Sequence, residues 1–171
     1  MELAGYKPNP WVYEMISSGN KSFYKIENGQ RKYYDIPSRS YRNIPGKEEF
    51  IILENLKDRI VWKNAESKVT DLGDGVINFA WHSKSYTLGS AVIEGMNKAI
   101  DLAEKDYKGL VIGHQGPDFS LGANLGLVFM FAIEQEFDEI DFMVRQFQNS
   151  VMRIRYSSVP VVVCPQGRTL G

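Results

Sequence analysis

Short apolar runs separated by polar or glycine-containing turns dominate the sequence from residue 49 onward, a pattern typical of buried strands. The predicted strands cover residues 50–53, 60–62, 68–72 and 76–81. Gly73-Asp74-Gly75 separates the last two and has the composition of a tight hairpin turn. The last strand places Ile77, Phe79 and Trp81 on one heavily apolar face and ends before His82.

A helical period follows this strand. Apolar residues recur at spacings of three and four, which places them on one face of a helix: Leu88, Val92, Met96, Ala99 and Ala103. Thr87 is the predicted N-cap. The next apolar run, residues 110–112, predicts a buried strand parallel to the previous one. A strand, a helix and a parallel strand form the building block of a layered α/β fold.

Two more helices are predicted over residues 125–134 and 138–156. The second carries an apolar stripe that we expect to pack on the sheet or on a neighbouring subunit: Ile140, Val144, Phe147, Val151 and Ile154. The run 159–165 predicts another buried strand, which contains Cys164. A cysteine nucleophile is conceivable there, but a reduced core cysteine is the favoured interpretation because no basic residue adjoins it.

Residues 1–48 have a different composition. A short helical patch, residues 11–16, follows Pro8 and Pro10 and ends at Gly19. Tyrosines and phenylalanine then alternate with lysines and arginines, which raises the possibility of RNA stacking. Acidic residues intervene and no RNA-binding motif is present, so we favour an extended segment whose rings pack on another surface. Prolines and Gly46 mark this segment as a linker.

The amino-acid composition argues against several classes of function. The 171 residues carry a formal net charge of −1 with scattered basic residues, which gives no reason to expect a nucleic-acid partner. The single cysteine excludes an internal disulfide and is typical of a reducing compartment. No apolar run approaches membrane-spanning length and the N-terminus lacks the features of a signal peptide. We therefore expect a cytoplasmic protein without membrane contact.

The central candidate is the stretch 109–125, GLVIGHQGPDFSLGANL. A buried strand runs into a polar, glycine-containing turn and then into a helix. Such a turn leaves backbone N–H groups aimed outward, where they can bind an anion or a developing oxyanion. A glycine that serves only to reverse the chain produces the same pattern, so the pattern alone does not decide between the two.

The amino-acid sequences of three segments resemble those of a known protein family. FSLGANL resembles the FSAGAD-type signature of the crotonase (enoyl-CoA hydratase/isomerase) family, and VPVVVCPQGRTLG is similar to the segment of that family that ends in three glycines. LGDGVINFAWHSKSYTLGSAVIEGMNKAI is similar to its first strands and first helix. The resemblance implies a crotonase-like (ClpP/crotonase) spiral of ββα units, incomplete at the C-terminus.

Within that family, the chain looks most like part of the bacterial fusion proteins that join a 3-hydroxyacyl-CoA dehydrogenase to an enoyl-CoA hydratase. Residues 1–48 then correspond to the tail and linker of the preceding dehydrogenase part, and residues 49–171 to the N-terminal portion of the crotonase-like domain. The implied function is acyl-CoA thioester binding with oxyanion stabilisation in fatty-acid β-oxidation. The alternative is a non-catalytic interaction or assembly module without acyl-CoA turnover.

The resemblance also assigns roles to residues. The N–H of Ala123, which follows Gly122, corresponds to one oxyanion donor. Gly171 matches the first of the three glycines, of which the middle one supplies the second donor. The residues expected to line the substrate site are His82, Ser83, Lys84, Phe119, Ser120, Leu121, Asn124 and Gly171. Ser85 is a further CoA candidate, and Lys84 is equally well explained as a solvated surface charge.

Several departures limit the expected activity. The glutamate that acts as general acid or base in hydratases falls beyond Gly171, so we expect the chain alone to be inactive. Asn124 replaces an aspartate, and Tyr86 replaces a small polar residue or asparagine. The other polar groups near the loop are expected to be solvated charges or satisfied histidines: Asp118, Glu134, Glu136, His82 and His114.

No metal site and no cofactor are expected in the chain itself. The sequence has no G-x-G-x-x-G motif, so NAD would belong to the missing dehydrogenase part. Apolar surface left exposed by missing parts predicts self-association or docking to those parts.

Overall fold

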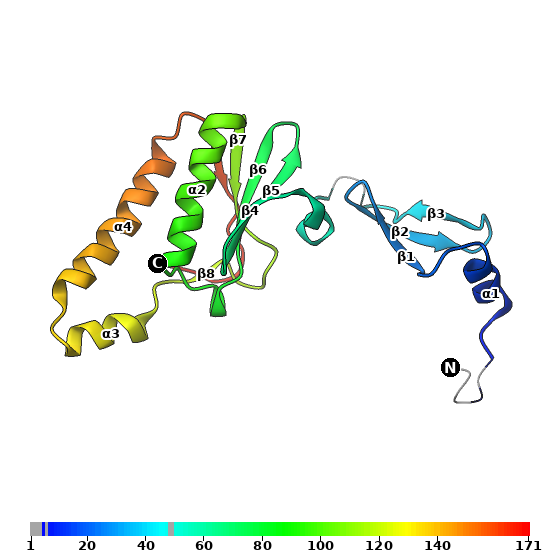
Figure 1. Cartoon of the computed structure of the whole chain (residues 1–171), viewed down its shortest axis with the longest axis horizontal. Helices are drawn as coiled ribbons and strands as arrows, with labels where there is room; N and C mark the ends of the chain where they lie inside the picture. The colour runs from blue at the N-terminus through cyan, green and yellow to red at the C-terminus, as the bar shows by residue number, and fades with distance from the viewer. Residues whose placement is uncertain (1–4, 6, 48–49) are drawn as a thin grey trace. The chain divides into compact units, whose positions relative to one another are not determined.

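The computed structural model describes residues 5, 7–47 and 50–171. Their contacts divide the chain into two compact units, Met1–Asn55 and Leu56–Gly171 (Figure 1). The predicted boundary between residues 48 and 49 lies outside the described residues. The assignment of the first part to the tail of a dehydrogenase stays a prediction.

The first unit is a helix followed by a three-stranded antiparallel meander. Its elements are α1 (Pro10–Ser17), β1 (Tyr24–Glu27), β2 (Gln30–Asp35) and β3 (Ser40–Asn43). The predicted helical patch is therefore confirmed, with Asn9 as N-cap and Gly19 at a φ of 85° just beyond the end. Asn28 and Gly29, at φ values of 53° and 76°, form the tight turn between β1 and β2.

The prediction that this region is an extended segment whose rings pack on another surface was wrong, whereas its role as a linker stays a prediction. The aromatic residues pack on one another within the unit: the ring centroids of Phe23 and Tyr24 lie 5.1 Å apart and those of Tyr34 and Tyr41 lie 5.6 Å apart. Tyr34 is only 3% exposed. The physical reason is the Asn28-Gly29 turn, which pairs the strands and gives the rings partners inside the unit.

The second unit is built on a five-stranded mixed sheet of order β4-β5-β6-β7-β9. The strands are β4 (Ile60–Lys63), β5 (Ser67–Gly73), β6 (Val76–Trp81), β7 (Gly109–Ile112) and β9 (Val161–Val163). The first three pair antiparallel, and β6, β7 and β9 pair parallel. Asp74 and Gly75, with φ values of 54° and 81°, make the predicted hairpin turn. The strand predicted at 50–53 is absent, and a 3₁₀ segment, η2 (Leu53–Arg59), begins there instead.

Helix α2 (Ser90–Asp106) packs on one face of this sheet and completes a single hydrophobic core. The most buried side chains of the core include members of the predicted strand face and helix face, namely Ile77, Phe79, Val92, Ala99 and Ala103, and three residues outside those faces, namely Val69, Ile100 and Leu110. A Cβ on Gly95 would overlap the side chain of Ser67, so glycine allows α2 to approach β5 closely.

Thr87 is not the N-cap of α2. The cap position is Gly89, whereas the Thr87 hydroxyl donates to the Lys84 carbonyl at 3.0 Å and closes the short 3₁₀ turn η3 (Lys84–Tyr86). The hydroxyl is therefore used one turn earlier in the chain, where a nearer carbonyl is available.

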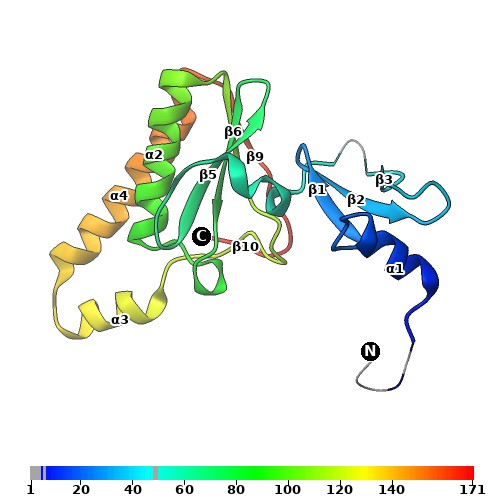
Figure 2. The same ribbon diagram turned by 45° about the vertical axis from the view of Figure 1, so that its right-hand side comes forward.

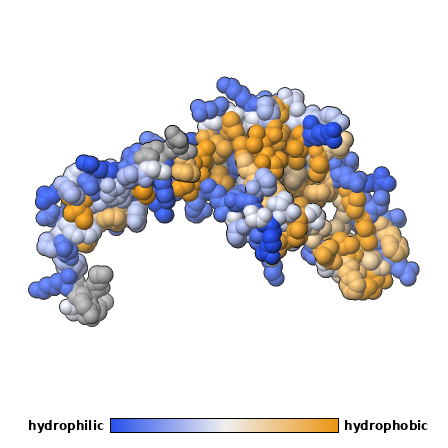
Figure 3. Space-filling model, turned by 180° about the vertical axis from the view of Figure 1, so that it is seen from behind, coloured by the Kyte–Doolittle hydropathy of each residue, from blue (hydrophilic) through white to orange (hydrophobic). Residues whose placement is uncertain are grey.

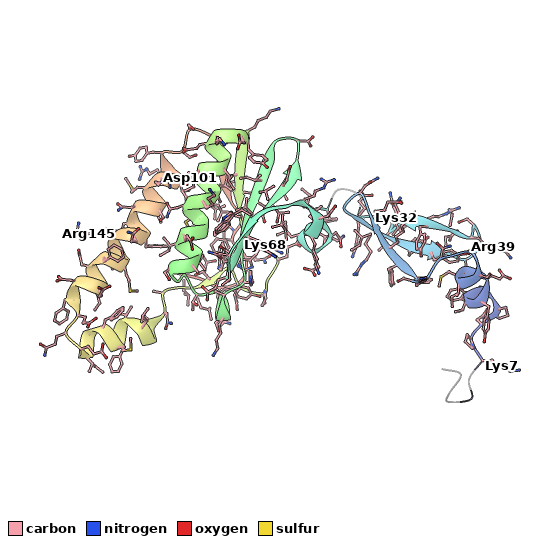
Figure 4. All side chains as sticks on the ribbon, viewed as in Figure 1. Lys7, Lys32, Arg39, Lys68, Asp101 and Arg145 are labelled. Carbon is pink, nitrogen blue, oxygen red and sulfur yellow. The ribbon has the colours of Figure 1, made fainter. Side chains whose placement is uncertain are left out.

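The remaining elements are β8 (Ser120–Leu121), α3 (Leu125–Ile133), α4 (Phe137–Arg155) and β10 (Thr169–Leu170). Helix α4 lies beside α2, as Figures 1 and 2 both show, and polar groups join them. The Asn97 amide donates to Ser150 Oγ at 2.7 Å, and Arg153 pairs with Asp101, which Figure 4 shows on the side of α2 that faces α4.

One burial prediction for this part was wrong and another is untested. The apolar stripe of α4 is only partly covered within the chain, because Val144 and Val151 are exposed, and its packing on a neighbouring subunit stays a prediction. Strand β9 was predicted to be buried, yet Val162 and Val163 are 56% and 46% exposed and Cys164 is exposed as well. Strand β9 is the edge of the sheet, and α2 covers the sheet centre rather than this edge. In the part of the chain that the structure describes, no helix is long and apolar enough to cross a membrane.

Candidate functional site

The candidate site lies where β6 and β7 end. Because these strands are parallel, the turns that follow them, residues 82–86 and 113–119, meet at the same edge of the sheet. The C-terminal segment, residues 164–171, reaches the same edge after β9 (Figure 2). Strand β10 of this segment pairs parallel with β8, in the register Thr169 with Ser120 and Leu170 with Leu121.

Gly122 is the residue at which the loop and the C-terminal segment come closest. Its φ is 83°, and a Cβ built on it would overlap the carbonyl oxygen of Gly171. Its N–H donates to Ser120 Oγ at 2.9 Å, and its carbonyl accepts from the Leu88 N–H at 2.9 Å. Both the conformation and the lack of space therefore require glycine.

Ala123 follows directly and is exposed. Among the described residues, no group accepts a hydrogen bond from its N–H. The next residue, Asn124, is the N-cap of α3, and its Oδ1 accepts from the Leu127 N–H at 3.3 Å. The Ala123 N–H is therefore an unpaired donor beside a helix N-terminus, where the helix dipole favours negative charge.

The site residues predicted after β6 differ in how accessible their side chains are to a ligand. His82 is exposed and its Nε2 lies 3.1 Å from the Ala65 carbonyl oxygen. Ser83 is buried, and its hydroxyl donates to the Thr87 carbonyl at 2.6 Å. Lys84 is exposed on η3. Lys84 is thus the most available of the three for a ligand, whereas Ser83 already has a partner inside the turn.

The residues predicted in the FSLGAN motif hold the loop. The Phe119 N–H donates to the carbonyls of Gln166 and Arg168, at 2.8 Å and 3.0 Å. Ser120 is buried and accepts from Gly122, and Leu121 pairs with β10. The structure brings Phe119, Ser120, Leu121, Gly122, Ala123, Asn124 and Gly171 together. Their contact with a ligand stays a prediction.

The sequence reasoning missed two residues that shape this loop, Gln166 and Arg168. Arg168 Nε and a terminal guanidinium nitrogen donate to the two carboxylate oxygens of Asp118 at 3.0 Å and 2.7 Å. These hydrogen bonds lower the pKa of Asp118 to about 2. Asp118 is therefore an ion-pair partner rather than the solvated charge that we expected.

Gln166 bridges the loop from the same side. Its amide donates to the His114 carbonyl at 2.8 Å and also to the Gly116 carbonyl. About fifty residues separate these partners along the chain, and no local pattern signals such a contact. Glu134 and Glu136 are exposed at the junction of α3 and α4, as predicted. Within the described ranges, no group of three metal-ligating side chains is assembled.

The chain is similar in sequence to known proteins. No protein-family model matches the chain. Over its whole length the chain is 40% identical to a probable 3-hydroxyacyl-CoA dehydrogenase of Bacillus subtilis, of which it spans 22%. Over 98% of its length it is 26% identical to a putative fatty acid oxidation complex trifunctional enzyme of Rickettsia felis, of which it spans 24%. The chain thus spans about a quarter or less of these curated relatives.

Solved structures match about 60% to 67% of the chain. An enoyl-CoA hydratase from Shewanella pealeana superposes with a TM-score of 0.54 at 18% identity, covering 67% of this chain and 42% of the hydratase. One from a Polaromonas species gives a TM-score of 0.53 at 21% identity, covering 59% and 40%. Human enoyl-CoA hydratase domain-containing protein 3 gives 0.52 at 27% identity, covering 60% and 40%. The chain therefore has part of the fold of these hydratases.

Proposed function

We propose that this chain, which carries part of the fold of enoyl-CoA hydratases, forms one side of an acyl-CoA thioester site in a fatty-acid β-oxidation protein. One observation carries the proposal. The parallel pairing of β8 with β10 sets Gly171 against Gly122, so the two segments that resemble the oxyanion-hole segments of crotonases lie side by side.

The chemistry follows from the unpaired donor. The carbonyl oxygen of a bound thioester accepts a hydrogen bond from the Ala123 N–H, at the N-terminus of α3. Negative charge that develops on this oxygen is stabilised there by the donor and by the helix dipole. Loss of one oxyanion donor typically costs roughly 3 to 4 kcal/mol of transition-state stabilisation. In the segment that the stretch ending at Gly171 resembles, the second donor is the middle one of three glycines, and Gly171 matches the first of them.

The rest of the proposed site is contributed by the turn after β6. Lys84 provides a positive charge for a CoA phosphate, and His82 and Ser83 flank it. No residue is assigned the role of the general acid or base, so we expect this chain to bind a thioester without hydrating it. The described residues contain no G-x-G-x-x-G turn for NAD, so oxidation of 3-hydroxyacyl-CoA is assigned to the part of the relatives that this chain does not span. A cytoplasmic location fits this role.

The test is a calorimetric titration of the 171-residue chain with acetoacetyl-CoA, a thioester that undergoes no hydration. Free CoA is the matched ligand control, because it keeps the nucleotide and pantetheine but lacks the thioester carbonyl. We expect heat with acetoacetyl-CoA and at least about tenfold weaker binding of free CoA, the effect of roughly 1.4 kcal/mol at the carbonyl. No heat at millimolar acetoacetyl-CoA contradicts the proposal.

A second function, an interaction or assembly module, is favoured by the α3–α4 arm. We use this name for residues 125–155, whose exposed apolar side chains include Leu125, Phe129, Met130, Ile133, Phe137, Phe142 and Val144. Figure 3 shows hydrophobic residues gathered over this arm. Monomeric soluble proteins rarely expose so continuous an apolar surface. Self-association that is independent of acetoacetyl-CoA, together with no binding of that ligand, would favour this module.

A further inference from the structure

We propose that His114 is the positioning residue of the candidate oxyanion loop, and that its imidazole holds the turn leading to Gly122 and Ala123 by bridging two backbone groups. The inference rests on the proposed function, because it concerns the same loop. His114 follows β7 and Gly113 and precedes the FSLGAN motif, and from the sequence we expected only a satisfied histidine at this position.

The hydrogen bonds of the imidazole define its protonation state. The Gly116 N–H donates to Nδ1 at 3.1 Å, so Nδ1 is an acceptor and carries no proton. Nε2 lies 2.9 Å from the Phe119 carbonyl oxygen, which can only accept, so the ring proton is on Nε2. The ring thus connects Gly116 to Phe119 and closes the loop across three residues.

Aromatic packing fixes the plane of this ring. Tyr86 stacks on it with a centroid distance of 4.5 Å and an interplanar angle of 13°. The Trp81 ring packs edge-on against it, with a centroid distance of 4.6 Å and an interplanar angle of 81°. The Phe119 ring lies nearly parallel to it, with a centroid distance of 6.1 Å and an interplanar angle of 8°. Tyr86 holds this place with a φ of 53°, a left-handed conformation that costs a bulky residue free energy. The surrounding contacts therefore select one ring orientation.

Contacts on the other side connect His114 to the segment that carries Gly171. The Gln166 side-chain amide donates to the backbone carbonyls of His114 and Gly116. The Gln166 backbone carbonyl accepts from the Phe119 N–H at 2.8 Å. Phe119 leads directly into β8, whose pairing with β10 brings Gly122 against Gly171. Movement of the imidazole would therefore be transmitted to both sides of the candidate oxyanion hole.

The bridge requires a neutral imidazole. Burial lowers the pKa of His114, although its hydrogen bond to the Phe119 carbonyl acts in the opposite direction. The ionisable side chains on the elements around it are Lys84 and Tyr86 on η3, His82 between β6 and η3, Cys164 after β9, and the mutually paired Asp118 and Arg168. Protonation would place a second proton on Nδ1, facing the Gly116 N–H, and would break that hydrogen bond. We therefore expect the loop to loosen in acid.

Two measurements test the bridge without any ligand. Long-range ¹⁵N–¹H NMR of the imidazole reports its tautomer, and we expect the Nε2–H form at about pH 7.5. Amide hydrogen exchange reports the Gly116 N–H, which we expect to be protected at about pH 7.5 and to lose protection as His114 becomes protonated. An Nδ1–H tautomer at neutral pH would overturn the proposal.

Two variants separate the hydrogen bonds from the packing. His114→Phe keeps a flat ring for Tyr86 and Trp81 to pack on but removes both hydrogen bonds. His114→Gln removes the stacked ring but keeps an amide donor that can reach the Phe119 carbonyl. We expect acetoacetyl-CoA to bind about five- to tenfold more weakly to the phenylalanine variant, as for the loss of one or two net hydrogen bonds, with partial recovery in the glutamine variant.

The pH profile distinguishes positioning from simple structural support. Binding by the wild-type chain should weaken as the pH falls from about 7.5 to about 5, whereas binding by His114→Phe should be weak and should lose this step. An unchanged affinity, or the same pH step in the phenylalanine variant, contradicts the positioning role. If the wild-type chain binds no acetoacetyl-CoA, the proposed function fails, and the tautomer and the Gly116 exchange still decide whether His114 holds the loop.

Discussion

The candidate site and the α3–α4 arm belong to the same unit, yet they are stabilised in opposite ways. At the site, residues 114–122 and 166–171 are held by hydrogen bonds, an ion pair and a two-residue strand pairing. The arm is almost entirely apolar along α3, which buries none of its nine residues. Local polar contacts can therefore fix backbone donors in place, whereas the apolar side chains of the arm stay exposed unless another surface covers them.

The strongest way to break the site is to replace Gly122 by valine. Its positive φ and the overlap of a Cβ with the Gly171 carbonyl should together lower the free energy of unfolding by about 2 to 4 kcal/mol. The substitution should also separate β8 from β10 and abolish binding of acetoacetyl-CoA. Chemical denaturation and calorimetry measure the two effects.

Gly171→Ala is the matched control for stability. A Cβ at Gly171 meets nothing within 4 Å, so this variant should unfold at the same denaturant concentration as the wild type. Equal stability of Gly122→Val and the wild type would mean that the close approach of the two segments is not required by the fold.

The arm is tested by making it polar. Phe129 and Ile133 are 67% and 64% exposed, so replacing both by glutamate should change the free energy of unfolding by less than about 0.5 kcal/mol. Self-association, if the arm drives it, should weaken at least about tenfold in sedimentation velocity, because removing two large apolar side chains from an interface typically costs more than 1.4 kcal/mol. Ile26→Glu, at an exposed apolar position of the first unit, is the control. An undiminished association constant in the double variant would exclude the arm as the contact surface.

The smallest effect is expected from the ion pair at the edge of the site. The pKa of Asp118 is about 2 in the folded chain, below its ordinary value of 3.8, because Arg168 hydrogen-bonds the carboxylate. A lowered pKa means that the pair stabilises the fold above about pH 4 and that this contribution is lost as the pH falls toward 2.

Asp118→Asn should therefore be slightly less stable than the wild type at about pH 6, and the difference should vanish toward about pH 2. Thermal unfolding at several pH values measures it. Because both groups lie at the surface, the difference should be small and should shrink further at high salt. A stability difference between Asp118→Asn and the wild type that grows as the pH falls would contradict a lowered pKa of Asp118.

Most of the second unit could be predicted from local patterns. The Asp74-Gly75 turn, the face formed by Ile77, Phe79 and Trp81, and the periodicity of α2 each depend on residues that are close in sequence. The FSLGAN motif likewise identified Gly122, one of the glycines whose φ is positive. These features follow from backbone conformation and side-chain period, which neighbouring residues determine.

The errors share a different cause. The burial expected for Val162, Val163 and Cys164 depends on what lies beside β9, and an apolar run does not specify whether a partner surface is present. The pairing of Asp118 with Arg168 joins residues that come together only through the sheet topology. In the first unit, the aromatic residues were assigned to an outside surface because the meander that gives them partners was not recognised.

The stack of Tyr86 on His114 has a consequence for how this loop can evolve. A Cβ at Gly116 would lie 2.5 Å from the Tyr86 ring, so the large side chain at one position depends on the absence of one at the other. Neither residue can change alone without a clash or a gap. Among homologous chains, a substitution at position 116 should therefore be accompanied by a smaller residue at position 86, and the two positions should be inherited as a pair.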